Sequence, residues 1–238
     1  MTARSKTAKA RPKRARGISG DPKHAVLAAA LVHIPFDGFT DSVLARAAKE
    51  ADVSDTEMTR LFPEGPLSLV EAFSGWADAE MVRTLAQRNL APLKIRERIA
   101  FAVNTRISVL KPHKEAARRA AAFLSLPPHA ALALKLLYRT VDAIWRAIGD
   151  TSTDFNFYTK RAILAAVYSS TLLRWFSDTG ANEQETGDFL RRRIDDVMRF
   201  EKFKVQVRER ASGLPSLSDF FNPGRRGKTR ARARAKRG

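Results

Sequence analysis

The chain contains no cysteine, which excludes disulfides, thiolate metal sites and a cysteine nucleophile. It also lacks an apolar run long enough to span a bilayer as a helix, and no hydrophobic signal-peptide segment follows its basic start. Its 238 residues suffice for a sizeable core in one larger domain or two small ones. These absences fit a protein that folds in a reducing compartment.

Several sequence patterns of enzymes are missing as well. There is no G-x-S-x-G serine elbow, no glycine-rich phosphate loop and no E-x-x-H pattern of a di-iron bundle. The neighbouring Asp195 and Asp196 point to different faces of a helix, which favours solvated carboxylates over an acid/base pair. The four histidines are scattered and show no metal-ligand spacing: His24, His33, His113 and His129. We therefore expect no catalytic residue, no metal and no cofactor.

Positive charge is concentrated at the two ends of the chain. The formal net charge is +18, but residues 1–16 hold seven Lys or Arg and residues 225–238 hold eight, without any acid. The body is close to charge-balanced. Such ends are expected to be disordered and to attract polyanions, either nucleic acid or anionic lipid, or else to act only as solubilising tails. The first of them also resembles an organellar presequence, although the matching tail at the other end favours a bacterial cytoplasmic protein.

Hydrophobic residues recur at helical spacing along the body, and no segment alternates with the period of a strand. We therefore predict an all-α fold. Ser54 and Glu57 form a capping box before one short helix. The expected helices cover roughly residues 22–34, ending before Pro35, then 41–50, 54–61, 66–85, 92–110, 116–126, 130–148, a long one within 149–178, and one from about 186 to 211.

The first four expected helices follow the order helix, turn, short helix, aromatic-Pro, long helix. Three segments resemble the helix-turn-helix module of TetR-type regulators: Phe36-Asp37-Gly38-Phe39, residues 44–54, and Leu61-Phe62-Pro63. The resemblance implies a TetR-like bundle of about nine helices. We expect a basic tail at 1–18, a helix-turn-helix-like module at 19–78, a second helical domain at 79–212, and a short amphipathic segment with a basic tail at 213–238.

The third helix of such a module reads the DNA major groove with donors and cations. Here it holds Asp55 and Glu57, with Asp52 nearby and Arg60 as the opposing cation. An acidic helix is repelled by phosphates, whereas binding normally gains from each neutralised phosphate. We therefore expect a degenerate module without specific DNA binding. The alternative is a TetR-type DNA-binding transcriptional regulator whose basic tails supply the phosphate affinity.

The stretch from Gly149 to Asp178 organises the rest of the chain. It holds no charge between Ala162 and Leu173, which is typical of a buried helix. A stripe of small residues (Ala162, Ala165, Ala166, Ser169) would let another helix or a flat apolar ligand come close. By analogy with the final two helices of TetR-type proteins, this stripe and the last amphipathic helix predict a homodimer.

The segment from Thr153 to Ala162, followed by residues 164–168, closely resembles the signature of the coenzyme Q biosynthesis accessory proteins. The resemblance covers about residues 20–205. It implies a non-catalytic protein that binds isoprenoid or quinone-like lipid and presents it to a membrane-associated hydroxylase of ubiquinone biosynthesis. It further implies a cytoplasmic protein at the inner membrane if bacterial, or one of the mitochondrial matrix if eukaryotic.

The family's partner-binding patch matches five residues of this signature: Asp154, Asn156, Phe157, Tyr158 and Arg161. An aromatic pair beside charged residues has the mix of anchor and charge expected of an interface. Core packing at the start of a helix is the alternative for the two rings. Relatives often have Trp at the position of Phe157, so an N–H donor is lost here.

A bound prenyl chain would need a dry tunnel, and its burial would contribute about 25 cal/mol per Å² of apolar area. Tyr168 and Trp175 are the preferred wall residues because each offers a polar group on an apolar surface. Core packing is the alternative for every position. The full set expected to contact lipid is Phe101, Phe123, Leu136, Trp145, Leu164, Tyr168, Leu172 and Trp175.

The end of the chain carries a short apolar face followed directly by a basic tail. Leu217, Phe220 and Phe221 fall at i, i+3 and i+4, and eight Lys or Arg follow, beginning with Arg225 and Arg226. Apolar rings together with a polybasic segment provide two membrane signals, with about 1 kcal/mol for each basic residue near an anionic surface. We therefore expect reversible binding to anionic bilayers.

Overall fold

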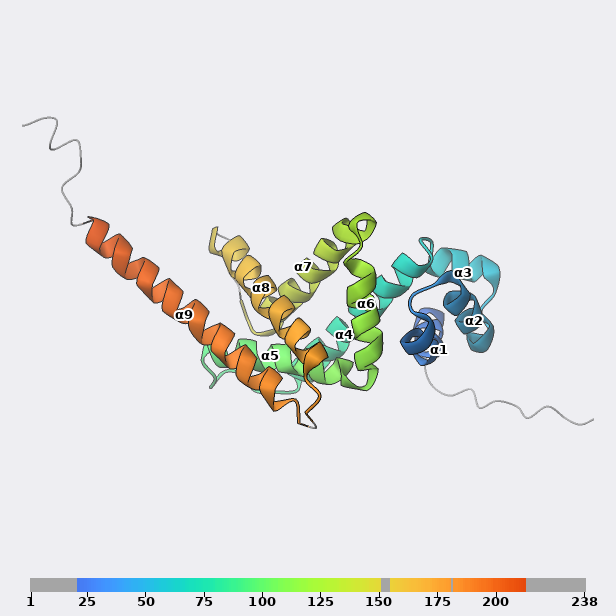
Figure 1. Ribbon diagram of the computed structural model, residues 1–238, viewed down its shortest axis with the longest axis horizontal. Helices are drawn as coiled ribbons and strands as arrows, with labels where there is room; N and C mark the ends of the chain where they lie inside the picture. Colours follow the sequence, from blue (N-terminus) through green and yellow to red (C-terminus); the bar gives the residue numbers. More distant parts are fainter. Residues whose placement is uncertain (1–20, 151–154, 181, 213–238) are drawn as a thin grey trace, which may run out of the picture. The chain divides into compact units, whose positions relative to one another are not determined.

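The computed structural model describes residues 21–150, 155–180 and 182–212, and all regular structure in these ranges is helical (Figure 1). The all-α prediction is therefore confirmed. The chain divides into two compact units, residues 1–165 and 166–238. The elements are α1 (Pro22–Asp37), α2 (Asp41–Ala51), α3 (Asp55–Leu61), α4 (Pro66–Ala86), α5 (Ile95–Leu110), η1 (Lys111–His113), α6 (Lys114–Leu124), η2 (Pro127–His129), α7 (Ala130–Ala147), α8 (Phe155–Ser177) and α9 (Gln184–Ser212).

Helices α1, α2 and α3 form the module at the start of the first unit (Figure 1). Each is capped by a side chain that accepts a backbone N–H of the first turn: Asp21 from Lys23 at 3.0 Å, Thr40 from Val43 at 3.3 Å, and Ser54 from Glu57 at 3.4 Å. Such caps satisfy N–H groups that the helix itself leaves unpaired. Of the capping box expected from the sequence, the Ser54 half is present, whereas the Glu57 carboxylate pairs with Arg60 at 3.4 Å.

Helix α1 corrects one expected boundary, because it continues through Pro35 and ends at Asp37. A proline in the last turn removes a single backbone donor, and the chain carries that loss without breaking the helix. The N–H of Gly38 still donates to the carbonyl of Ile34 at 2.9 Å. Gly38 then reverses the chain with φ of +71°, a conformation that residues with a Cβ rarely adopt.

Two further helices begin a few residues away from the expected positions. Helix α5 starts at Ile95, three residues after Pro92, because the Glu97 carboxylate accepts the Lys94 N–H at 2.9 Å and fixes the first turn there. Helix α6 covers Lys114–Leu124, two residues earlier than the expected 116–126. Both differences lie within the usual one to four residues by which boundaries shift.

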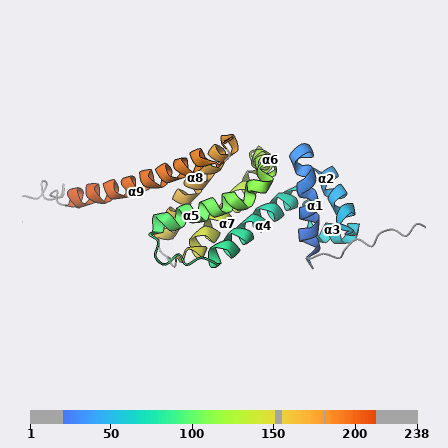
Figure 2. The ribbon, with the colours of Figure 1, turned by 90° about the horizontal axis from the view of Figure 1, so that it is seen from below.

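Helices α4, α5 and α7 run side by side next to the module (Figure 2). Arg106 of α5 is 4% exposed and joins all three helices. Its Nε donates to Asp78 of α4 at 2.7 Å and its Nη2 donates to Ser74 at 3.2 Å. Thr140 of α7 donates to the same carboxylate at 3.0 Å. Both α4 partners of the buried charge, Asp78 and Ser74, thus come from a neighbouring helix, and Asp78 extends the network to α7.

A row of aromatic rings connects the module to these helices. Phe39 lies after α1, and its ring centre is 6.2 Å from that of Phe73 in α4 and 6.1 Å from that of Phe123 in α6. Phe73 stacks on Trp76 at 6.0 Å, and Trp76 meets the edge of His113 at 5.5 Å. Offset and tilted pairs at these distances contribute about 0.5–1.5 kcal/mol beyond the area they bury.

The second unit is built from the end of α8, a turn, and α9. Asp178 is 3% exposed; its Oδ2 accepts the N–H of Thr186 at 2.9 Å and the hydroxyl at 2.7 Å, and its Oδ1 accepts the N–H of Gly180 at 3.0 Å. Trp175 is fully buried, and its Nε1 donates to Glu183 at 2.7 Å. These bonds fix the turn from which α9 begins.

Within the described ranges, no single helix is both long and apolar enough to cross a bilayer. A bent pair, residues 95–124 followed by 127–147 at an angle of 97°, satisfies the criteria of length and composition only when the two are taken together.

Candidate partner-binding site

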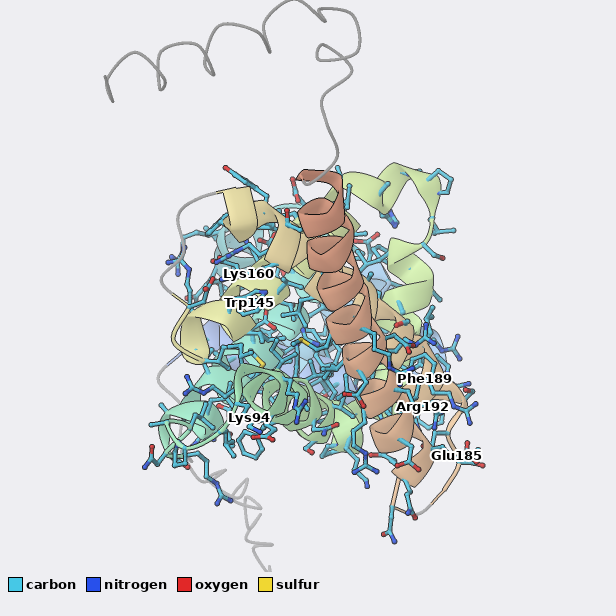
Figure 3. The ribbon with its side chains drawn as sticks, turned by 90° about the vertical axis from the view of Figure 1, so that its left-hand side faces the viewer. Lys94, Trp145, Lys160, Glu185, Phe189 and Arg192 are labelled. Atoms are coloured by element: carbon cyan, nitrogen blue, oxygen red, sulfur yellow. The ribbon has the colours of Figure 1, made fainter. Side chains whose placement is uncertain are left out.

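The end of α7 and the beginning of α8 meet in the first unit, where Trp145 and Lys160 lie next to each other (Figure 3). Trp145 Nε1 donates to the carbonyl oxygen of Lys160 at 3.3 Å, and Lys160 Nζ lies 5.5 Å from the centre of the indole ring. Lys160 Nζ also donates to Asp150 at 3.0 Å. After α7 the chain turns at Gly149, whose φ of +89° is a backbone conformation that favours glycine.

Arg161 lies at the centre of this junction and is 4% exposed. Its Nε and Nη2 both donate to Asp142 Oδ1, at 2.8 and 2.7 Å. Its Nη1 donates to the Phe157 carbonyl at 3.3 Å and lies 3.5 Å from Asp150 Oδ2. The guanidinium carbon is 3.4 Å from the centre of the Phe157 ring, so the planar group also stacks on an aromatic face.

Two more cations complete the charge balance of this cluster. Asp142 accepts a bond from Arg146 Nε at 2.6 Å, while Asp150 accepts from Lys160. The side chains of Arg146 and Lys160 are 73% and 39% exposed, whereas those of Asp142 and Asp150 are 17% and 7% exposed. The two carboxylates therefore face inward, and within this cluster of described residues the side chains more exposed to solvent are the positively charged ones.

Among the described side chains of the junction, Tyr158 is an aromatic residue with 68% of its surface accessible. Its ring meets the half-buried ring of Phe157 edge to face at 5.1 Å. Phe157 is held in turn by the Arg161 guanidinium. An aromatic side chain on a rigid, charged support can anchor another protein at little entropic cost.

The structure separates the residues expected to contact a partner into three groups. Phe157 and Tyr158 are brought together at the surface. Arg161 is buried and engaged with Asp142, so it supports the surface and does not form it. Asn156 belongs to the first turn of α8, while its side chain and all of Asp154 lie outside the described residues. Asp142 and Asp150 were not anticipated from the sequence.

The chain matches the family model of COQ9 over residues 130–201, a range that contains this whole junction. It is 32% identical to "Ubiquinone biosynthesis protein COQ9, mitochondrial" from Homo sapiens over 199 residues, which are 81% of this chain and 62% of the human protein. The protein of the same name from Drosophila melanogaster is 31% identical over 186 residues, 76% of this chain and 57% of that protein. The chain resembles the COQ9 family over most of its own length.

The chain therefore spans less than two thirds of the length of these curated relatives. Among solved structures it resembles a TetR transcriptional regulator from Nitrosomonas europaea, with a TM-score of 0.59 at 20% identity over 74% of this chain and 97% of that one. This likeness concerns the fold. It confirms the TetR-like arrangement expected from the helix order.

The residues of this COQ9 relative that were expected to contact lipid are mostly buried. In the first unit Leu136, Trp145 and Leu164 are 2–6% exposed, while Phe101 and Phe123 are half-buried. Such burial serves a packed core and a lipid wall alike. Phe123 stacks on His129, with ring centres 4.1 Å apart, in addition to its contact with Phe39.

In the second unit, Tyr168 and Trp175 are 4% and 0% exposed, and Leu172 is half-buried. The indole N–H of Trp175, expected to serve a ligand, is bonded to the carboxylate of Glu183 at 2.7 Å. That N–H is therefore engaged within the protein.

A surface groove of about 460 Å³ lies between α4 and α5. Of the residues expected to contact lipid, Phe101 lines it. The remaining lining is largely polar and includes the ion pair of Glu80 with Arg83. The lining mixes these polar groups with the apolar side chains of Phe101 and Val109, so the groove fits an amphipathic occupant better than a prenyl chain alone. Among the described residues, no group of three or more His, Asp or Glu is placed to hold a metal ion.

The third helix of the module keeps its acidic character in the folded chain. In α3, Asp55 is exposed and Glu57 half-buried, and Arg60 is paired with Glu57 at 3.4 Å. The positive charge of Arg60 is thus partly neutralised by Glu57. The five residues expected to touch the membrane, Leu217, Phe220, Phe221, Arg225 and Arg226, lie outside the described residues.

Proposed function

We propose that this protein is a non-catalytic, lipid-binding accessory protein of ubiquinone biosynthesis, which binds isoprenoid or quinone-like lipid and presents it to a membrane-associated hydroxylase. Similarity to the COQ9 family supports the pathway, because the curated relatives are named for ubiquinone biosynthesis. A cytoplasmic protein at the inner membrane, or one of the mitochondrial matrix in a eukaryote, would be placed for this task.

The observation that supports this proposal best is the junction of α7 and α8. Tyr158 is 68% exposed, yet its neighbour Phe157 is fixed by a buried arginine that two carboxylates share. Ordering a solvent-facing ring adds little to the stability of the monomer. It does strengthen binding to a partner, because the side chain that anchors the interface is already in position. The exposed Arg146 and Lys160 would form a basic rim for an acidic partner surface.

Retention of the hydroxylase on the immobilised protein tests the partner surface. Tyr158→Ala should weaken retention at least tenfold, since truncation of an interface anchor typically costs about 2 kcal/mol or more. Tyr138→Ala is the matched control, because Tyr138 is a 48% exposed tyrosine on α7. Equal retention by the two variants would remove the junction from the interface.

Lipid cargo is tested by extracting the purified protein and identifying bound lipids by mass spectrometry. We expect a polyprenylated quinone or phenol, recovered in stoichiometric rather than trace amount. A second TetR-fold protein, purified by the same steps, is the control for carry-over from membranes. Empty protein, or bulk phospholipid alone in both samples, would reject the carrier role.

Membrane binding is proposed for the last segment, through the apolar face of Leu217, Phe220 and Phe221 and the eight Lys or Arg that follow. The full chain should sediment with vesicles that contain phosphatidylglycerol, less so as salt rises, and the chain ending at residue 213 should remain in solution. Equal sedimentation of both forms would contradict this part of the proposal. A homodimer through the small-residue face of α8 and through α9 is proposed along with it.

The second candidate function is a TetR-type regulator, favoured by the likeness to the Nitrosomonas europaea structure. Its difficulty is α3, whose exposed Asp55 would face DNA phosphates. Gel-shift binding at physiological salt separates the two functions. Sequence-specific binding that survives removal of both basic tails would establish the regulator, and loss of binding together with the tails would leave the accessory role standing.

A further inference from the structure

The connection between α4 and α5 is strongly basic. Residues 87–98 comprise this connection and the first turn of α5, and they hold four Lys or Arg and one acid. Three of the cations, Arg88, Lys94 and Arg96, are exposed. The acid is Glu97, whose carboxylate accepts the backbone N–H of Lys94 at 2.9 Å. We call residues 87–98 the α4–α5 corner.

The exposed cations of this corner differ from the others of the first unit in having no acidic partner. Every exposed arginine described in that unit outside the corner forms an ion pair with a carboxylate: Arg46, Arg60, Arg83, Arg118, Arg119, Arg139 and Arg146. No carboxylate in the described ranges pairs with Arg88, Lys94 or Arg96. Neighbouring like charges raise the local potential, so an anionic surface placed against them is attracted strongly.

The fourth cation, Arg98, is half-buried and holds the corner in a fixed shape. Its Nε donates to the Leu93 carbonyl at 2.9 Å, and its Nη2 donates to the Ala91 carbonyl at 3.0 Å. Its Nη1 donates to the carbonyl of Ile148, at the end of α7, at 3.2 Å. The side chain of Asn89 also accepts the N–H of Ala91 at 3.1 Å. The exposed charges are therefore presented by a backbone that is already ordered.

Apolar side chains lie among these cations. Ile95 is 44% exposed, Ala91 and Pro92 are exposed, and Leu90 and Leu93 are half-buried. The corner contains no aromatic residue. Aromatic anchors dominate protein interfaces and stack the bases of nucleic acids. Apolar residues set among Lys and Arg suit instead the interfacial layer of an anionic bilayer.

We propose that the α4–α5 corner rests on the surface of an anionic bilayer, with Arg88, Lys94 and Arg96 against the lipid headgroups. This inference rests on the proposed membrane association of the last segment and adds a second contact in the body of the protein. The chemistry recognised is the negative charge of the headgroups together with the apolar layer directly beneath them.

This contact would also orient the protein. In Figure 3 the viewer looks onto one side of the first unit, where Lys94 lies below Trp145 and Lys160. The bond from Arg98 to Ile148 connects the corner directly to the end of α7. A corner on the bilayer therefore brings the junction of α7 and α8 close to the membrane with which the hydroxylase is associated.

Three cations are a weak membrane signal by themselves. Each Lys or Arg near an anionic surface raises affinity about fivefold, so the corner alone would leave the protein largely in solution. Once the last segment is on the bilayer, contact by the corner becomes an intramolecular step, and the two contacts reinforce each other. The corner should therefore affect how tightly the full chain binds and which side it turns towards the lipid.

Sedimentation of the full chain with vesicles of phosphatidylglycerol and phosphatidylcholine tests the affinity. A triple variant of the corner should bind at least tenfold more weakly than the unaltered chain: Arg88→Gln, Lys94→Gln and Arg96→Gln. The matched control alters net charge equally at three exposed arginines that pair with acids, and should bind within about twofold of the unaltered chain: Arg118→Gln, Arg119→Gln and Arg139→Gln.

The outcomes separate this proposal from the one on which it rests. Equal weakening by the two triple variants overturns the role of the corner, because net charge alone would then determine binding. A corner variant that keeps its vesicle affinity but loses retention of the hydroxylase overturns it too, since an acidic protein would be the occupant. A full chain that does not sediment with the vesicles rejects membrane association altogether.

The absence of native cysteine allows a test of orientation with one environment-sensitive dye on each full chain. Ala91→Cys carries the dye at an exposed position of the corner. Ala131→Cys carries it at an exposed position near the start of α7, about 25 Å along the helix from Ile148. On the same vesicles, emission should shift to shorter wavelength for the dye at residue 91 and stay unchanged at residue 131. Equal shifts at both positions, or no shift at residue 91, overturn the proposal.

Discussion

Two buried arginines in this chain, Arg106 and Arg161, both pair with a carboxylate on a neighbouring helix, but they lie in different surroundings. Arg106 and Arg161 each have a side chain that is 5% exposed, and each donates two bonds or more to neighbours on other helices. Arg106 is surrounded by the scaffold: Asp78 takes its charge, and hydroxyls complete the site. Arg161 instead lies directly beneath the surface residues Phe157 and Tyr158.

The surroundings of the two carboxylates differ in one decisive respect. Besides its pair with Arg106, Asp78 accepts a bond from the hydroxyl of Thr140, which is neutral. Asp142 keeps a second cation, Arg146, at 2.6 Å. The cost of losing an arginine depends on the charge that remains buried afterwards. The scaffold arginine should therefore matter most for stability, and the junction arginine most for recognition.

The largest effect is expected for Arg106→Met, which leaves the Asp78 carboxylate buried with neutral neighbours. Breaking a buried pair in this way typically costs about 3–5 kcal/mol. Urea unfolding measures the loss. A matched double variant, Arg106→Met with Asp78→Leu, removes both charges and should recover part of it. A single variant that loses less than about 1 kcal/mol would show that water reaches Asp78 readily, and the contrast between the arginines would disappear.

Arg161→Met should destabilise the protein less, by about 1–3 kcal/mol, because Arg146 and Lys160 still neutralise the two carboxylates. Its larger effect should fall on the hydroxylase, since Phe157 loses the group that holds it. Arg161→Lys keeps the charge without the planar stack, and should recover stability more than partner retention. Equal recovery of both properties would mean that charge alone is required.

The sequence predicts the order of helices well and the two arginine sites poorly. Helix positions follow from local signals, such as the Ser54 cap and Pro66 at the start of α4. The pairing of Asp78 with Arg106, 28 residues later, depends on how α4 and α5 pack. Arg161 was expected at the interface because the resemblance matched it there, while a distant partner such as Asp142 leaves no local signal. One clue existed, since Asp142 and Arg146 stand four residues apart.

His113 differs from the two buried arginines, because burial disfavours its charged form. An arginine stays charged when buried, whereas burial lowers the pKa of His113 below its ordinary 6.5 and favours the neutral ring beside Trp76. As the pH falls below 6.5, His113 becomes protonated in the unfolded chain before it does so in the folded one. The free energy of unfolding therefore decreases as the pH falls towards the folded-state pKa of His113. Thermal unfolding at pH 7.5 and 5.5 should show a smaller decrease for His113→Phe than for the unaltered chain. Identical decreases would mean that the ring is solvated.

The smallest effect on stability is expected for Tyr158→Ala, because Tyr158 is the most exposed of the residues compared. Its side chain is 68% exposed, and surface changes of this kind usually alter the free energy of unfolding by less than about 0.5 kcal/mol. The same change should abolish most partner retention, because the anchor itself is removed. Urea unfolding and retention, measured on one preparation, separate the two quantities. A loss above about 1 kcal/mol in the free energy of unfolding would show that Tyr158 packs as part of the core. If the Tyr158→Ala and Tyr138→Ala variants retained the hydroxylase equally, Arg161 would have only a structural role.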